Sequence, residues 1–315
     1  MKIIQRRGLP AWHFITRVAS GAALLALALR PEAARGQSLY ETDGGGVVNQ
    51  ILANGSISTF ASGFSFPVGL AFATSGNLFV ADSNFNTIFE VTHSGIVTTF
   101  VSGLSNPFGV AFSTSGNLFV ANNSNGTISE VTPGGVVSPF ATGFVSPVGL
   151  AFDSGGNLFV SNENTGNISE ITPGGTVSTF ATGLNKPCGL ALSTSGNLFV
   201  SNDGNGSITE ITPGDVESVF ASGFNEPLGL TFDALGDLFV SNDGNGTISE
   251  VTSLGVSSTY VNSSAGLSPN FLAFGAVSIP EPAYEAAALG LAGLAAVWWR
   301  KSRKQMHWRR LVTFR

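Results

Sequence analysis

Short apolar runs alternate with turn residues along most of the chain, and the pattern recurs with a fixed period of 40 residues. The run Gly76 to Val80, Gly-Asn-Leu-Phe-Val, returns four more times at that spacing, once with Asp237 in place of Asn. An aromatic residue marks one position of every copy: Phe60, Phe100, Phe140, Phe180, Phe220 and Tyr260. A fixed period between roughly 20 and 50 residues predicts a solenoid, a propeller or another repeat array.

Each copy contains four short runs rich in Val, Ile, Phe and Thr, a composition that suits β-strands. In one copy these runs span residues 109–112, 117–121, 127–132 and 136–140. Turn sequences such as Pro133-Gly134 separate the runs and supply the backbone conformations of tight hairpins. The copies lack helical periodicity, which excludes a helical solenoid. Four strands joined by hairpins predict one propeller blade per copy.

The two incomplete ends of the array predict how the propeller closes. Shifted by 200 residues, the segment Leu39 to Gly44 falls on Phe239 to Gly244, so the N-terminal unit begins at its second strand. Residues 269–274, Pro-Asn-Phe-Leu-Ala-Phe, match the first strand of the preceding copy. We therefore expect an all-β, six-bladed β-propeller over residues 38–277, with blade one closed by the C-terminal strand so that no sheet edge stays open.

The sequence Pro-x-Gly-Leu-Ala-Phe followed by Gly-Asn-Leu-Phe-Val-Ser-Asn resembles the NHL repeat. The resemblance covers about residues 38–277 and implies the propeller fold. The basic residues that often follow the second strand of NHL repeats are missing, so the nucleic-acid binding of some NHL proteins is not expected. Lys186 is the one basic residue in the repeats, against 17 Asp and Glu between Glu41 and Glu250. A surface of that charge repels phosphate backbones, which excludes a nucleic-acid partner.

The N-terminal residues 1–36 have the features of a signal peptide. A basic start precedes the apolar run Val18 to Leu29, and Ala34-Arg35-Gly36 offers small residues for cleavage. A twin-arginine signal at Arg6-Arg7 is the alternative to a plain basic region. These features predict export from the cytoplasm.

Three features follow one another after the propeller: Pro280-Glu281-Pro282, the apolar run Ala286 to Trp299, and basic residues at 300–304. Their order resembles the PEP-CTERM sorting signal of Gram-negative bacteria, which implies export across the inner membrane, processing by an exosortase and display at the cell surface or release. We assign residues 278–304 to this signal with one transmembrane helix, and residues 305–315 to a basic cytoplasmic tail, because basic clusters stay on the cytoplasmic side. A permanent single-pass anchor is the alternative.

Functional residues are expected at one mouth of the propeller, where the loops before the first strand and after the second strand gather. Lys186 and Glu226 are the least repeat-like residues there. The candidate ligand-binding residues are Asp82, Asn122, Asn162, Glu163, Lys186, Asn202, Asp203, Glu226, Asn242 and Asp243. The alternative is that these Asn and Asp residues simply form good turns.

Catalysis has little support in the sequence. His13 and His307 lie in the terminal segments and His93 lies in a hairpin turn, so no His–Ser–Asp or Cys–His arrangement is expected. The repeats are also similar to those of streptogramin-lyase-like propellers, which depend on a catalytic His, but His93 is placed on the opposite rim. Gluconolactonase-like propellers instead hold a divalent cation with Glu, Asn and Asp, and oxygen ligands suit Ca²⁺. No cofactor is firmly implied.

One carboxylate or amide recurs on the third strand of each copy: Gln50, Glu90, Glu130, Glu170, Glu210 and Glu250. We expect these side chains to be solvated and to discourage association of sheets, with a cation-binding belt as the alternative. The lone Cys188 takes an apolar position of the repeat and is expected to be buried.

Together these features favour an exported, surface-associated propeller that acts without catalysis as a binding or scaffold protein, with a protein or polysaccharide as its ligand. Its other expected partners are an exosortase and the membrane. The alternative function is a metal-dependent lactonase-type hydrolase acting at the propeller mouth.

Overall fold

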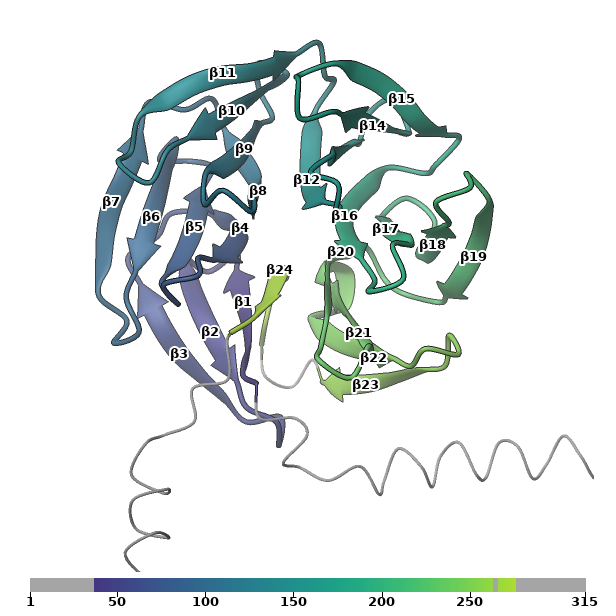
Figure 1. Ribbon diagram of the computed structural model, residues 1–315. Coiled ribbons are helices and arrows are strands. Elements are labelled where there is room, and N and C mark those ends of the chain that lie inside the picture. The colour runs from purple at the N-terminus through teal and green to yellow at the C-terminus, as the bar shows by residue number, and fades with distance from the viewer. Residues whose placement is uncertain (1–36, 263–265, 276–315) are drawn as a thin grey trace, which may run out of the picture. The chain divides into compact units, whose positions relative to one another are not determined.

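The computed structural model describes residues 37–262 and 266–275, which form six four-stranded antiparallel sheets (Figure 1). The predicted all-β, six-bladed propeller is confirmed. The predicted signal peptide at 1–36, the sorting signal with its transmembrane helix at 278–304 and the tail at 305–315 lie outside the described residues. Within the described part of the chain, no helix has the length and apolar character needed to span a bilayer.

Every blade places its strands in the same order from the ring axis outwards. Blade 1 contains β24 (Pro269–Phe274), β1 (Leu39–Asp43), β2 (Val47–Ile51) and β3 (Ile57–Ser62). Blade 2 contains β4 (Pro67–Phe72), β5 (Leu78–Asp82), β6 (Thr87–Val91) and β7 (Val97–Ser102). Blade 3 contains β8 (Pro107–Phe112), β9 (Leu118–Asn122), β10 (Thr127–Val131) and β11 (Val137–Thr142).

Blade 4 contains β12 (Pro147–Phe152), β13 (Leu158–Asn162), β14 (Asn167–Ile171) and β15 (Val177–Thr182). Blade 5 contains β16 (Pro187–Leu192), β17 (Leu198–Asn202), β18 (Ser207–Ile211) and β19 (Glu217–Ser222). Blade 6 contains β20 (Pro227–Phe232), β21 (Leu238–Asn242), the short 3₁₀ helix η3 (Asp243–Asn245), β22 (Thr247–Val251) and β23 (Ser257–Val261).

The ring closes through β24, as the sequence predicts. The innermost strands contact one another in sequence around the axis, and β24 contacts both β20 and β4 (Figure 1). β24 also pairs with β1, and the Ser268 backbone N–H donates to the Asp43 carboxylate at 2.8 Å. Blade 1 is therefore built from both ends of the described chain, and its inner edge is covered.

The predicted register of β1 is wrong by one residue. Asp43 pairs with Pro269, just as Asp82 pairs with Pro67 in blade 2, so Leu39 takes the position of Leu238 and not of Phe239. The cause is a loop after β1 that is one residue shorter than its counterparts. The shift keeps the core pattern, because it places Tyr40 in the aromatic slot of the second strand.

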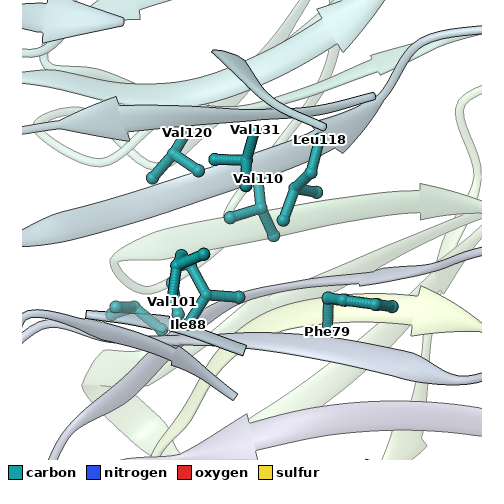
Figure 2. Packing of buried hydrophobic residues seen from close by; sticks show 9 residues of the cluster. Phe79, Ile88, Val101, Val110, Leu118, Val120 and Val131 are labelled. Carbon is teal, nitrogen blue, oxygen red and sulfur yellow. The ribbon is translucent and has the colours of Figure 1, made fainter. Parts of the chain in front are cut away.

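Aromatic side chains hold adjacent blades together. The second-strand ring packs edge-to-face on a fourth-strand ring and on the first-strand Phe of the next blade, as Phe119 does on Phe140 and Phe152 with centroids 4.8 and 5.0 Å apart. Buried aliphatic residues fill the space around each aromatic group, and Figure 2 shows them between blades 2 and 3. Leu192 replaces this first-strand Phe at the interface of blades 4 and 5.

Glycines in the innermost strands allow close approach at the ring axis. A methyl group on Gly149 would clash with the backbone carbonyl of Cys188 in the next blade. Blade 1 is the exception, because Phe271 occupies the glycine position of β24. Cys188 is 3% exposed, which confirms its predicted burial.

Candidate functional site

The propeller presents two different faces. The Asx face carries the loops after each second strand and before each first strand, such as residues 83–86 and 103–106. The hairpin face carries the turns between first and second strands and between third and fourth strands, such as residues 73–77 and 92–96. The loops of the Asx face are joined by backbone hydrogen bonds, including Asp203 N–H to the Lys186 carbonyl at 3.1 Å. All ten candidate binding residues belong to this face.

The candidate residues that end the second strands are buried. They are Asp82, Asn122, Asn162, Asn202 and Asn242, each at most 3% exposed. The Asn122 side chain accepts from the Ser105 backbone N–H at 3.3 Å and donates to the hydroxyl groups of Thr127 and Ser129 at 3.1 and 2.9 Å. These bonds tie the loop between blades to the third strand. The structure thus gives these residues a role in shaping the face.

The choice between Asn and Asp at this position follows the third strand. Where the middle residue of that strand carries a hydroxyl group, as Ser129 does, the residue is Asn and its amide donates to it. Blade 2 carries Phe89 at that position, and there Asp82 acts only as an acceptor. Its carboxylate accepts from the backbone N–H groups of Ser65, Phe66 and Phe85 at 2.6, 3.2 and 3.0 Å.

The remaining candidates form the accessible rim of the Asx face. Lys186 is 57% exposed and pairs with Asp203 at 3.4 Å, while Asp243 accepts from the Ser268 hydroxyl at 2.7 Å. Glu226 is exposed and Glu163 is partly exposed. Lys186 and Glu226 both have φ of 50°, a left-handed conformation that is uncommon outside glycine. The two least repeat-like residues are therefore held in defined, outward positions.

The resemblance to gluconolactonases implies a divalent cation held by Glu, Asn and Asp side chains at the propeller mouth. No group of three or more His, Cys, Asp and Glu side chains within the described ranges has the arrangement of a metal site. The second residues of the innermost strands are mainly apolar: Val68, Phe108, Val148, Cys188, Leu228 and Asn270. His93 lies in the β6–β7 turn on the hairpin face, opposite the Asx face, as predicted.

Glu41 has a buried carboxyl group, and the predicted register of β1 did not indicate its burial. It is 0% exposed and takes the position that Val80 and Val240 hold in other blades. Asn49 donates to its Oε1 at 2.7 Å, while Oε2 has no partner. Burial, with a smaller contribution from the charge of Asp43, raises the pKa of Glu41 to about 7 despite the bond from Asn49. The group is enclosed, so it affects stability and not substrate chemistry.

The recurring glutamates of the third strands are not simply solvated, and that expectation is wrong. Glu90, Glu130 and Glu210 are half-buried. They accept hydrogen bonds at 2.7, 2.6 and 2.6 Å from Asn77, Asn117 and Asn197, which end the hairpin turns. The sequence signal for these bonds was the recurrence of Asn before each Leu-Phe-Val.

The hairpin face contains two neighbouring hollows that the sequence did not indicate. A hollow of 660 Å³ lies between blades 4 and 5, with Phe159, Glu170 and Leu192 among its walls. A second hollow of 450 Å³ lies between blades 5 and 6 and shares the segment 192–195. Leu192 was visible in the sequence as a departure from Phe, but its consequence depends on packing between blades.

Comparison with known proteins agrees with this architecture. The family model described as Virginiamycin B lyase family matches residues 32–251. Among curated proteins, none matches the sequence significantly.

Three solved structures illustrate the similarity in fold. A catalytically inactive variant of virginiamycin B lyase from Staphylococcus aureus with quinupristin has a TM-score of 0.58 and 18% identity, over 72% of this chain and 85% of that chain. The nidogen/laminin complex has a TM-score of 0.69 and 18% identity, over 76% and 98%. A gluconolactonase from Xanthomonas campestris has a TM-score of 0.60 and 18% identity, over 71% and 84%. The predicted resemblance to lyase-like and lactonase-like propellers is confirmed, and at these identities it concerns the fold.

Proposed function

The chain belongs to the virginiamycin B lyase family, and we propose that it is an exported propeller of this family that binds a surface ligand without catalysing a reaction. The observation that carries the proposal is the construction of the Asx face. Its central Asn and Asp side chains are used within the fold, and its rim presents the exposed Lys186, paired with Asp203, and the exposed Glu226, on backbone held at φ of 50°. A rigid polar rim suits recognition of a protein or polysaccharide.

The ligand proposal is tested by replacing Lys186 and Glu226 with the residue that a sister repeat carries at the same position. Lys186→Ser and Glu226→Ser both copy Ser146, which has φ of 49° at the same position, so the fold is expected to tolerate them. We expect the double variant to lose retention on extracellular polysaccharide from the source bacterium and on its surface protein fraction. Thr132→Ser on the hairpin face is the matched control. Equal retention of the double variant and the parent would show that the rim residues Lys186 and Glu226 do not bind the ligand.

The competing activities are those of an enzyme. The variant of the staphylococcal lyase shows that the fold supports a lyase, and the xanthomonad protein is a gluconolactonase. In this chain His93 is the only histidine among the described residues, and it lies on the hairpin face. We expect no turnover of quinupristin or of a panel of lactones, with or without added Ca²⁺. Metal-dependent turnover by the purified protein, or stoichiometric metal in it, would favour the lactonase alternative.

We further propose that the protein is exported through its N-terminal signal and sorted by an exosortase. The support is the sequence order of the Pro280-Glu281-Pro282 motif, the apolar run and the basic cluster. Mass spectrometry of the mature protein is expected to find a C-terminus near residues 280–282. A mature form that retains residues 286–299 would instead identify a permanent membrane anchor.

A further inference from the structure

The hollow between blades 4 and 5 is the larger of the two on the hairpin face, and the aromatic packing is interrupted there. At the other five interfaces a first-strand Phe packs edge-to-face on the second-strand ring, with centroids 5.0 to 5.1 Å apart. At this interface Leu192 replaces that Phe, and Phe159 keeps only the ring of Phe180, at 4.8 Å. The hollow of 660 Å³ opens beside these side chains. Its size is that of a small-ligand site.

A second departure from the repeat occurs in the same hollow and frees a carboxylate. In blades 2, 3 and 5 the Asn before the second strand donates to the third-strand Glu. In blade 4 Asn157 bonds instead to Asp153, with Nδ2 to Oδ2 at 2.9 Å and the backbone N–H to Oδ1 at 2.8 Å. The Glu170 carboxylate therefore has no hydrogen-bond or ion-pair partner among the described residues, and it lines the hollow.

The chemistry of the walls selects a positively charged ligand. Phe152, Phe159 and Phe180 offer aromatic surfaces, which attract cations through the negative potential of their faces. Asp153 and the free Glu170 supply acceptors that bind ammonium or guanidinium groups by charge-assisted hydrogen bonds. No basic side chain lines the hollow within the described residues, because Lys186 lies on the Asx face. An incoming cation thus meets no competing charge from the walls.

We propose that this hollow binds an organic cation, an ammonium or guanidinium group on an apolar stem. The apolar stem would contact Leu192 and the phenylalanine rings, and the charged group would reach Glu170. Either a polyamine or a basic side chain of a peptide carries this chemistry. The site is on the face opposite the rim of the Asx face, so the proposal does not depend on what that rim binds.

Calorimetric titration of the full chain, purified in detergent, tests the ligand class. The probes are spermidine, the peptide Gly-Arg-Gly and the same peptide with neutral citrulline in place of arginine. We expect saturable binding of spermidine or the arginine peptide, and binding of the citrulline peptide weaker by about tenfold or more, the loss typical of one charge-assisted bond. Preference for spermidine identifies a free polyamine and preference for the arginine peptide identifies a basic segment. Equal binding of the citrulline peptide, or no binding of any probe at millimolar concentration, overturns the proposal.

Three variants locate the site. Leu192→Phe restores the residue of the other interfaces, should fold at least as well, and is expected to weaken binding by about tenfold or more, because the larger ring takes space that the apolar stem would use. Glu170→Gln keeps the shape and is expected to weaken binding about tenfold. Glu130→Gln changes the equivalent residue of blade 3, where Asn117 already occupies the carboxylate at 2.6 Å, and should leave binding unchanged. Unaltered affinity in a Leu192→Phe protein that melts like the parent contradicts the assignment.

Discussion

At the residue scale, Glu41 shows what one substitution does inside a repeated core. Sister blades fill its position with valine, and the carboxyl group therefore replaces apolar contacts with a single hydrogen bond from Asn49 at 2.7 Å. The charged form is disfavoured because burial removes its hydration. The protein accepts this cost in one blade out of six.

Glu41 makes stability depend on pH in a defined window. Its pKa is raised from 4.5 to about 7 in the folded protein, so the folded state binds the proton more tightly. Stability contributed by this group is full below pH 4.5 and is lost as pH rises to about 7, by about 3 kcal/mol at most. We expect Glu41→Val to remove this dependence, so that the variant exceeds the parent most at pH 8. Urea unfolding at pH 4.5 and pH 8 measures the difference, and an equal difference at both pH values would contradict it.

Asp82 offers a second test at this scale. Asp82→Asn would replace one acceptor oxygen of the carboxylate with an amide donor, although three backbone N–H groups donate to this side chain and Phe89 offers no hydroxyl group in the place of Ser129. We expect a loss of about 1–3 kcal/mol in unfolding free energy, the cost of leaving buried polar groups unpaired. Asn122→Asp is the control, because Ser129 can turn its hydroxyl group and donate to the carboxylate. A larger loss in the control than in Asp82→Asn would refute the explanation of the Asn and Asp pattern.

At the element scale, the innermost strands limit which side chains each blade can accommodate near the ring axis. The strands approach so closely at Gly149 that no side chain fits, whereas the outer turns tolerate Ala, His, Pro and Ser at equivalent positions such as His93 and Pro133. Close packing without voids makes overfilling as costly as cavities. The axial glycine therefore recurs in every blade except blade 1, where Phe271 takes its position.

Replacement of an inner glycine is expected to destabilise the propeller strongly. Gly149→Ala would press a methyl group into the Cys188 carbonyl, and we expect a loss of about 1–3 kcal/mol or more, seen as a lower melting temperature. Gly134→Ala is the control, because the nearest atom to its added methyl group is Thr132 Oγ1 at 3.9 Å. This control should change stability by less than about 0.5 kcal/mol. Similar losses in both variants would argue against axial crowding.

The strands were well predicted from the sequence, but the burial and contacts of the residues on the two faces were not, for physical reasons. Hydrophobic periodicity and turn residues define strands locally, which is why the blades and the closing strand were predictable. The register of β1 was not, because a one-residue deletion in a loop is silent until cross-strand pairs such as Asp43 with Pro269 are known. The hollow beside Leu192 was missed because it is created by residues from two blades. The burial of Asn122 likewise follows from partners in three loops and strands.

At the scale of the whole molecule, stability depends on completing the ring. Each blade uses the apolar face of its neighbour, and β24 supplies contacts to β1, β4 and β20 at once. Without it, β1 exposes an unpaired edge and the interface of blades 1 and 6 loses Leu272 and Phe274. Stability is then expected to fall for the entire ring and not for one blade.

Truncation tests this dependence. A protein ending at residue 262 lacks β24 and is expected to lose the single cooperative melting transition and to aggregate. A protein ending at residue 276 keeps every described strand and should melt as the full chain does, as followed by circular dichroism and light scattering. If both truncated proteins melted alike, closure by β24 would not be the determinant of stability.

The position of β24 also sets the order of events during synthesis. The chain emerges from its N-terminus, so β1, β2 and β3 exist for more than 200 residues before the strand that completes their sheet. During that interval the first sheet carries an open edge, a feature that promotes pairing between chains. The nascent protein therefore stays incomplete until its last repeat is made. A chaperone or a translocation channel that acts before that moment binds a chain whose ring has not yet closed.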